Sequence, residues 1–387
     1  MIIEWVMMIY KLAAGIMSGT SLDGIDVSIA KIKGQNEETK LEFIAGITVS
    51  WSLNVLNKLK KVIDLNSSNV RLISELNFEI AYEYFNALNK LCKEHSINTS
   101  DLDFISIHGQ TVWHDPSNKE MPTTLQIGDG AVLSALARTT VVSNFRVKDV
   151  VYGGQGAPLV PLVDKFIYGK FKKTISAHNL GGISNLTLID NGKVVLAFDT
   201  GPANMMINYF AKKLFNVDYD DKGTIASTGK LIKELYNEVM RQSFFKENPP
   251  KSTGRELFGD HYAKYLLDKY NGYKKEDYLY TITLITVDSI VNSYKKLLKE
   301  YQIDEIVFSG GGVHNDFIIT EIIKKLPQIS ISKSDKYGVS SDFKEAIAFL
   351  ILGNQTLNYQ VGNVKSATGA SEDLILGQVS YYDKRGI

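Results

Sequence analysis

Short apolar and alternating blocks predict strands before helices at the start of the chain. Apolar residues 6–14 and the alternating run 27–32 flank a turn rich in Gly, Ser, Thr and Asp, which predicts a β-hairpin. Residues 41–51 predict a third strand, and apolar positions recur at helical spacing over 70–95. Three strands followed by helices indicate a mixed sheet with covering helices.

Later blocks continue this pattern and end in polar clusters. The buried strand expected at 103–107 runs directly into His108-Gly109-Gln110-Thr111, and strands that end in such clusters usually end at a cleft. A glycine-rich loop at 152–158 precedes a helix that carries Asp164 in its second turn. Strands are also expected at 124–128 and 140–143, with a helix at 129–138 between them.

The order of strand, glycine turn and strand returns in the middle of the chain. The turn Gly181-Gly182-Ile183-Ser184-Asn185 stands between strands expected at 174–180 and 186–189. A later apolar strand, 303–308, ends in Ser309-Gly310-Gly311-Gly312. The similarity is one of pattern rather than of letters, and it predicts a diverged internal repeat. A further strand is expected at 194–198, and helices are expected at 204–214, 231–242, 261–268, 277–300, 314–325 and 343–352.

The length of the chain predicts two lobes. At 387 residues it exceeds the roughly 250–300 residues at which one hydrophobic core stops growing. We expect a first lobe over 1–170, a second over 171–359, and 360–387 packed back on the first. Two lobes provide a cleft in which a ligand can bind.

Charge and cysteine content narrow the classes of partner. The 43 basic and 43 acidic residues balance, so no net field favours nucleic acid or an anionic membrane. The single cysteine, Cys92, excludes an intramolecular disulfide or a cysteine-rich zinc site, and it fits a cytoplasmic location. Because Glu4 and Lys11 interrupt the apolar N-terminus, we interpret it as a buried strand rather than a signal peptide or membrane span.

The glycine turns are suited to the phosphates of a nucleotide. Backbone and hydroxyl donors of the first turn would meet phosphate oxygens, and Asp23 and Asp26 would hold Mg²⁺ directly or through water. The alternative is an ordinary hairpin turn. Two such turns, together with Gly310-Gly311-Gly312 against an adenosine, would hold ATP from both lobes.

Seven motifs between residues 15 and 377 resemble the anhydro-N-acetylmuramic acid kinase family. The resemblance implies an α/β fold of the actin-like ATPase and hexokinase class, with two ribonuclease-H-like lobes, ATP and substrate in the cleft between them, and a homodimer. It also implies that ATP and Mg²⁺ serve to phosphorylate the 6-oxygen of 1,6-anhydro-N-acetylmuramic acid while water opens the anhydro bridge, in cell-wall sugar recycling. The motifs lie at 17–24, 108–111, 153–164, 179–185, 199–202, 249–256 and 310–312.

The resemblance also assigns roles to residues. It makes Asp164 the base that deprotonates the attacking water, a task for which a carboxylate is chemically suited. Three of the expected sugar contacts could instead have a structural role. His108 could cap its strand, Arg146 could form an ion pair on the surface, and Glu345 could be a glutamate that stabilises the first turn of its helix. The ATP phosphates are expected at Gly19, Thr20, Ser21, Leu22, Asp23, Gly24, Ile25, Asp26, Gly181, Gly182 and Asn185, and the sugar at His108, Gln110, Thr111, Arg146, Gly201, Pro202 and, from the second lobe, Glu345.

Three departures from the family pattern leave the identity of the sugar open. Asn144 stands where an aspartate is expected, Ala203 where a glycine is expected, and Asn208 where an acid is expected. An amide keeps a hydrogen bond but loses the charge, so sugar recognition can differ. Levoglucosan or another anhydrosugar is the alternative substrate, and a non-catalytic, nucleotide-gated actin-like module is the alternative function. The spacing of Lys251 and Arg255 does not decide between phosphate and a lactyl carboxylate.

Overall fold

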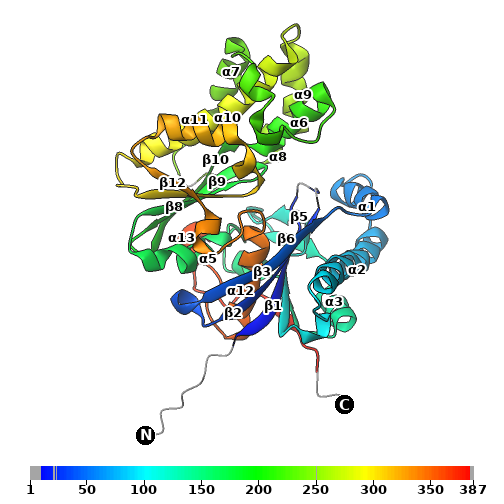
Figure 1. Cartoon of the computed structure of the whole chain (residues 1–387). Helices are drawn as coiled ribbons and strands as arrows, with labels where there is room; N and C mark the ends of the chain where they lie inside the picture. The colour runs from blue at the N-terminus through cyan, green and yellow to red at the C-terminus, as the bar shows by residue number, and fades with distance from the viewer. Residues whose placement is uncertain (1–9, 21, 23, 250, 384–387) are drawn as a thin grey trace. The chain divides into compact units, whose positions relative to one another are not determined.

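The computed structural model describes residues 10–383 except Ser21, Asp23 and Pro250. The chain forms two compact units, which we call unit 1 (residues 1–167 and 343–387) and unit 2 (residues 168–342) (Figure 1). It therefore passes between the units twice, after Ile167 and after Asp342. The second passage differs from the expected lobe boundary at 359, because the late helix packs on the first sheet.

Unit 1 is built on a sheet with the order β13-β7-β4-β1-β2-β3. β1, β2 and β3 are antiparallel neighbours, whereas β4 runs parallel to both β1 and β7. The strands are β1 (Lys11–Met17), β2 (Ile25–Lys33), β3 (Lys40–Val49), β4 (Phe104–Ile107), β7 (Val141–Ser143) and β13 (Gln378–Ser380), and a separate hairpin joins β5 (Gln110–Asp115) to β6 (Thr123–Ile127). The helices are α1 (Leu53–Ile63), α2 (Val70–Glu94), α3 (Gly130–Ala137), α4 (Val147–Val151), α5 (Val160–Tyr168), α12 (Lys344–Leu357) and α13 (Lys365–Thr368).

Two helices hold the sheet of unit 1. α2 contributes fully buried Tyr84 and Leu88 to the core formed with β1 and β2. α12 packs so closely on β1 that a Cβ atom at Gly15 would lie 1.9 Å from the carbonyl oxygen of Ala346. Glycine at this position is therefore required for close contact between strand and helix.

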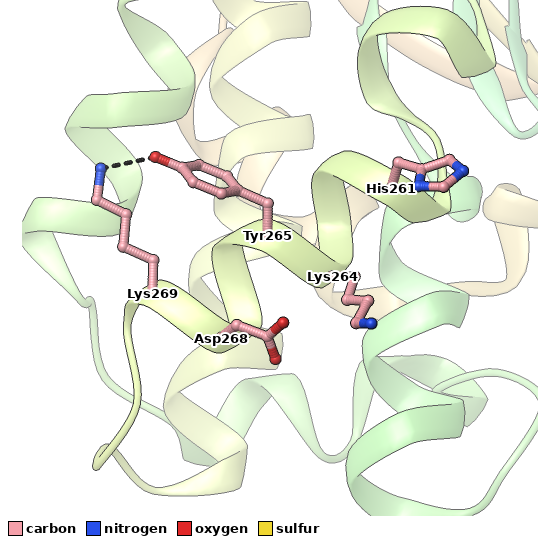
Figure 2. A pocket seen from close by; sticks show the side chains of 5 residues that line it. All are labelled: His261, Lys264, Tyr265, Asp268 and Lys269. Atoms are coloured by element: carbon pink, nitrogen blue, oxygen red, sulfur yellow. Dashed lines mark hydrogen bonds between the residues drawn. The ribbon is translucent and has the colours of Figure 1, made fainter.

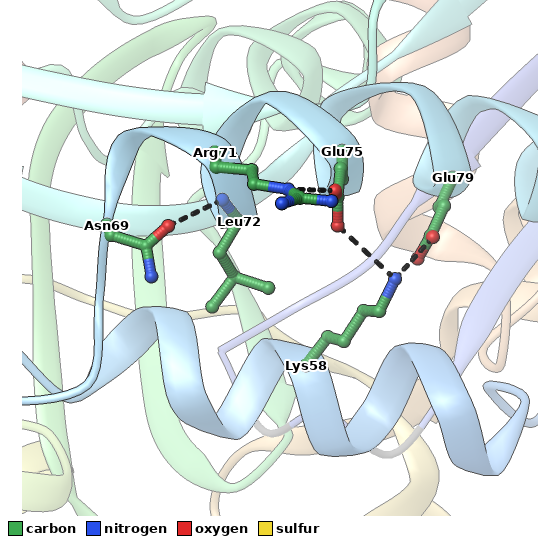
Figure 3. A network of polar contacts seen from close by, with 6 residues as sticks. All are labelled: Lys58, Asn69, Arg71, Leu72, Glu75 and Glu79. Carbon is green, nitrogen blue, oxygen red and sulfur yellow. Dashed lines mark hydrogen bonds and ion pairs between the residues drawn. The ribbon is translucent and has the colours of Figure 1, made fainter.

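A polar network ties α1 to α2 on the surface of unit 1 (Figure 3). Lys58 lies 2.5 Å from Glu79 and 3.8 Å from Glu75, and Glu75 also pairs with Arg71 at 2.8 Å. Asn69 caps α2 by accepting a hydrogen bond from the backbone of Leu72. These contacts are partly solvated, so each stabilises the pair of helices only modestly.

Unit 2 repeats the arrangement of unit 1 with the strand order β10-β9-β8-β11-β12. β8, β9 and β10 are antiparallel neighbours, and β11 is parallel to β8 and β12. The strands are β8 (Ile175–Leu180), β9 (Ile183–Asp190), β10 (Lys193–Pro202), β11 (Glu305–Ser309) and β12 (Ser330–Lys333), and the helices are α6 (Asn204–Phe215), α7 (Lys233–Met240), α8 (Arg255–Phe258), α9 (Asp260–Lys269), α10 (Lys275–Leu297) and α11 (Asp316–Lys325).

The shared strand order confirms the internal repeat expected from the sequence. In each unit, three antiparallel strands are followed by two parallel ones, which is the ribonuclease-H-like order, and its duplication is the actin-like ATPase fold. The first strand extends further than expected, because β1 runs from Lys11 to Met17 rather than ending at residue 14. Residues 15–17, which were expected in the turn, pair with β2, and the last pair is Met17 with Asp26. No helix of the described chain is long and apolar enough to cross a membrane.

Candidate active site

The turn between β1 and β2 is held by polar contacts on both sides. Leu22 adopts a left-handed φ of 59° and donates its N–H to the carbonyl of Gly19 at 3.3 Å. The hydroxyls of Ser18 and Tyr84 are 2.6 Å apart, and Tyr84 belongs to the buried face of α2. Ser21 and Asp23 lie outside the described residues, so the predicted phosphate contacts of this turn stay a prediction.

The His-Gly-Gln-Thr motif at the end of β4 contacts the backbone of this turn. His108 Nδ1 lies 3.3 Å from the carbonyl oxygen of Ser18, and Gln110 Nε2 donates to the carbonyl of Gly19 at 3.1 Å. Both side chains, which the sequence assigned to the sugar, therefore support the turn. Thr111, on β5, accepts a hydrogen bond from Gln126.

The protonation state of His108 follows from its two partners. Arg146 donates from Nε to His108 Nε2 at 2.9 Å, so Nε2 has to be the accepting nitrogen. Burial and then the nearby Arg146 charge lower the pKa of His108 to about 3. The imidazole is therefore neutral, and its Nδ1–H donates to Ser18.

Arg146 connects this histidine to the glycine-rich loop. Its Nη1 donates to the carbonyl of Gly156 at 2.9 Å. Burial lowers the pKa of Arg146 to about 10, while the carboxylate of Glu345 acts in the opposite direction. Glu345 thus lies near Arg146 within unit 1 and not, as the sequence suggested, in the second lobe. The reason is that α12 packs on β1.

Asp149, which the sequence did not single out, anchors the glycine-rich loop. Its fully buried carboxylate accepts hydrogen bonds from Gly156 N at 2.8 Å, Thr368 Oγ1 at 2.8 Å and Asn363 Nδ2 at 3.2 Å. A Cβ atom at Gly154 would lie 2.1 Å from Asp149 Oδ2. The glycine therefore lets the loop wrap around a buried carboxylate.

The predicted base Asp164 is buried on α5 and paired with a residue that sequence reasoning missed. Asp164 is 1% exposed, and the ammonium of Lys344 lies 2.7 Å from its Oδ1. Lys344 is 4% exposed and directly precedes Glu345 on α12. Asp164, Lys344, Glu345, Arg146 and His108 therefore form a polar region within unit 1.

The structure explains one of the two positions at which asparagine stands in place of an expected acidic residue. Asn144 stands between β7 and α4 with a left-handed φ of 58°, a conformation that asparagine tolerates better than most residues. Ala203, where a glycine was expected, is fully buried and donates its N–H to the carbonyl of Gly182. Nothing in the structure explains the amide at Asn208.

Two glycine turns and the start of α6 meet in unit 2. The carbonyls of Gly181 and Gly182 accept hydrogen bonds from the N–H groups of Asn204 and Met205 at 3.1 Å each, which fixes this turn on the start of α6. Asn204 also donates to the carbonyl of Leu180. A Cβ atom at Gly312 would lie 2.7 Å from Leu180 Cβ. The structure thus brings together two of the predicted ATP-binding elements.

The turn that follows β11 needs glycine for a second reason. Gly310 has a φ of 85°, and a Cβ atom there would lie 2.5 Å from Asn179 Oδ1. The expected adenosine contacts Gly310, Gly311 and Gly312 thus begin beside the polar end of β8. Gly201 and Pro202, expected to contact sugar, are buried at the end of β10, where Gly201 packs on side chains of unit 2.

The sheet of unit 2 presents different polar groups on its two faces. Asn179, Asn185 and Asp199 stand opposite one another on β8, β9 and β10, so they share one face and are partly exposed. On the other face, His178 and Ser184 are fully buried, and His178 bonds to Tyr294 of α10. The row of two amides and one carboxylate therefore lies on the face away from α10.

Asp199 is a further residue to which sequence reasoning gave no role. Burial raises its pKa to about 6, although the backbone N–H of Thr253 donates to Oδ2 at 2.8 Å and opposes the shift. Asp26, in unit 1, instead accepts from Thr48 Oγ1 at 2.6 Å. Among the described residues, no three His, Cys, Asp or Glu side chains gather around a potential metal position.

Two cavities lie away from these residues, both in unit 2. One, of about 480 Å³, follows the surface of α9, where Lys269 donates to Tyr265 at 2.9 Å (Figure 2). The other, of about 360 Å³, lies between β10 and α10 and is lined by Lys251 and Lys296. Lys251 donates to the carbonyl of Phe244 at 2.8 Å, and burial lowers its pKa to about 8. Asp164 and His108 line neither cavity.

Comparison with known proteins gives consistent matches over nearly the whole chain. The family model described as "Anhydro-N-acetylmuramic acid kinase" matches residues 11–382. A protein of that name from Francisella tularensis subsp. novicida (strain U112) is 45% identical over 96% of this chain and 99% of its own length. Another from Bacillus cereus (strain AH820) is 43% identical over 95% of this chain and 98% of its own.

Two solved structures align over most of the chain at low identity. Component A of (R)-2-hydroxyglutaryl-CoA dehydratase from Acidaminococcus fermentans gives a TM-score of 0.45 at 12% identity, covering 88% of this chain and 96% of its own. The activator of 2-hydroxyisocaproyl-CoA dehydratase from Clostridium difficile, with bound ADPNP, gives 0.44 at 15% identity, covering 91% and 99%.

Proposed function

The chain belongs to the anhydro-N-acetylmuramic acid kinase family, and from this premise we propose the reaction that it performs. It uses ATP to phosphorylate the 6-oxygen of 1,6-anhydro-N-acetylmuramic acid while water opens the anhydro bridge. The product is N-acetylmuramic acid 6-phosphate, and the reaction belongs to the recycling of cell-wall sugars. The observation that carries this proposal is the buried carboxylate of Asp164 in the same unit as Arg146 and Glu345.

The reaction needs one base and one phosphoryl acceptor. Asp164 takes a proton from water, and the water oxygen bonds to the anomeric carbon of the sugar. The bond from the anomeric carbon to the 6-oxygen breaks, and that oxygen bonds to the γ-phosphorus as ADP leaves. A carboxylate is suited to this because its oxygens can accept a proton from a water within hydrogen-bond reach.

The polar ends of the two sheets provide groups for ATP and Mg²⁺. In unit 1 these are the β1–β2 turn and Asp26; in unit 2 they are the Gly181–Gly182 turn, the Gly310 turn and Asp199. Oxygen ligands fit Mg²⁺, which neutralises phosphate charge when bound and usually keeps several waters. We propose Asp199 as a candidate contact in addition to Asp23 and Asp26.

The choice of sugar rests on Arg146. Its guanidinium already bonds to His108 and Gly156, so it presents a held, preorganised cation. The lactyl carboxylate of the muramic acid substrate would pair with it, whereas levoglucosan lacks that group. Arg146→Ala should therefore raise the KM for the muramic acid substrate and leave the KM for levoglucosan nearly unchanged. Arg138→Ala, at the C-cap of α3, is the matched control.

A panel of sugars in ¹⁸O-labelled water tests the reaction itself. The enzyme is incubated with ATP, Mg²⁺ and each of 1,6-anhydro-N-acetylmuramic acid, levoglucosan and glucose, and the products are read by mass spectrometry. We expect a 6-phosphate with the label at the anomeric oxygen, formed fastest from the muramic acid substrate. Phosphorylation of glucose alone would refute the proposal. Nucleotide binding without turnover of any sugar would favour the actin-like module.

Two further expectations belong with this function. We propose a homodimer, which sedimentation velocity would distinguish from a monomer of 43.2 kDa. We also propose a cytoplasmic location, because the reaction consumes ATP and the chain has a single cysteine, Cys92. Fractionation of cells that express the chain tests this.

A further inference from the structure

A buried cation stands beside the proposed base, and nothing in the reaction itself accounts for it. We propose that Lys344 is a positioning residue for Asp164: its ammonium holds Oδ1 in place, so that Oδ2 is the oxygen that receives the proton. This inference rests on the proposed function, since it names what orients the base of that reaction.

The geometry of the pair separates the two oxygens of Asp164. The ammonium lies 2.7 Å from Oδ1 as an ion pair, and no described residue donates a hydrogen bond to that atom. No described residue donates to Oδ2 either, so its lone pairs stay available to a substrate water. A base whose second oxygen is fixed in this way can rotate less about its side-chain bond, which favours a single direction for proton transfer.

The energetics make a purely stabilising role a weak explanation. Burying an aspartate and a lysine removes both charges from water, and their attraction offsets this loss only in part. Apolar replacements of similar size are often neutral or stabilising at such sites. The side chains here are 2% and 4% exposed. The pair therefore fits a site in which the charge of the carboxylate matters more than the stability of the core.

The pair also lies where the chain passes between the units. Asp164 is three residues before the first passage, and Lys344 is the second residue after the other. The ion pair thus ties α5 to α12 beside both passages. Because Glu345 follows Lys344 and lies near Arg146, the same helix start orients the base and the arginine. Both members of the ion pair belong to unit 1.

Four variants test the inference in the full-length enzyme. Lys344→Met removes the charge at similar volume, Lys344→Arg keeps it, and Asp164→Asn is made with and without Lys344→Met. Lys165→Met is the matched control, because Lys165 follows Asp164 on α5 but pairs with Glu37 at 2.7 Å near the surface. Each variant is assayed for kcat, for the KM of ATP and the KM of the sugar, for nucleotide binding, and for folding by tryptophan fluorescence.

We expect Lys344→Met to lower kcat by about 10- to 100-fold while the KM for ATP stays within twofold, since misplacement of a catalytic group acts on the chemical step. Lys344→Arg should retain more activity, and Lys165→Met should match wild type. In the Asp164→Asn background, Lys344→Met should cause no further loss, because its partner is gone.

Two results would overturn the inference. One is a wild-type kcat for Lys344→Met, and the other is an equal loss in the presence and absence of the Asp164 carboxylate, which would place the action of Lys344 elsewhere. Should Lys344→Met fail to fold, Lys344→Leu, which also removes both the charge and the ammonium beside Oδ1, is judged by the same criteria. An inactive wild type would instead refute the proposed function.

Discussion

The neutral state of His108 predicts a specific loss of stability in acid. In the folded chain the imidazole accepts from Arg146 and donates to Ser18, and burial lowers its pKa to about 3, whereas an unfolded histidine has a pKa near 6.5. Between these values the unfolded state binds more protons than the folded state. Stability contributed by the neutral histidine is therefore complete above about pH 6.5 and is lost as the pH falls.

The magnitude follows from proton linkage. One full proton difference changes the free energy of unfolding by about 1.4 kcal/mol per pH unit, and because the unfolded histidine is only half protonated at pH 6.5, the loss from pH 6.5 to pH 4.5 is about 2 kcal/mol. His108→Gln retains an accepting oxygen for Arg146 but does not titrate. Wild type should thus lose about 2 kcal/mol more than this variant over that range. His95→Gln, at the exposed C-cap of α2, should follow wild type.

Tryptophan fluorescence reports the unfolding of unit 1 by itself. The three tryptophans stand at positions 5, 51 and 113, all within the first 167 residues. Urea titrations at pH 4.5, 5.5, 6.5 and 7.5 then give the pH dependence for each variant. Parallel curves for wild type and His108→Gln would refute the assignment of a buried neutral imidazole, as would a steeper acid loss in the variant.

Three further changes have defined outcomes. Asp164→Asn should lower turnover to a small residual rate and leave ATP binding, measured by calorimetry, unchanged; a variant with wild-type activity would mean that another residue is the base. Gly15→Ala should destabilise unit 1 by about 1–3 kcal/mol in urea titrations and lower kcat, because its Cβ would collide with the backbone of α12, and a wild-type midpoint would contradict this contact. Asp199 has a raised pKa of about 6, so the free energy of unfolding falls as the pH rises from about 4 to 6 and stays lower above pH 6. The free energy of unfolding of Asp199→Asn should therefore exceed that of wild type by at most about 3 kcal/mol at pH 7.5 and should equal it near pH 4. Thermal unfolding followed by circular dichroism would show this difference.

Local pattern was enough to predict the repeated sheets and several site segments. Strands and glycine turns leave a signal within a few residues, and the two hairpins and the Gly310 turn stand where the pattern indicated. Family resemblance then pointed to Asp164, which the structure places in a buried polar region. Its catalytic role stays a prediction until the variant is measured.

The partners of these residues left no local signal. Lys344 contacts Asp164 from a helix that begins far along the chain, and Asp149 bonds to Asn363 and Thr368 near its end. In the sequence, Lys344 looks like any residue at the start of a helix. The spacing of apolar residues along one segment indicates which face of that segment is buried, but it does not indicate which distant segment packs on that face. The family resemblance suggests the second lobe for Glu345, whereas the contacts of the folded chain group it with unit 1.

The polar region of unit 1 consists of contacts that an apolar core would replace with greater stability. His108 with Arg146, Asp149 with its three donors, and Asp164 with Lys344 each place titratable groups out of water. All three join segments from separate parts of the chain: β4 to α4, α4 to the C-terminal region, and α5 to α12. Such contacts fix the direction of single oxygen and nitrogen atoms, which apolar packing does not do. Their presence in the unit that holds Asp164, beside a core under α2 built from apolar side chains, fits the proposal that the direction of single atoms matters at this carboxylate.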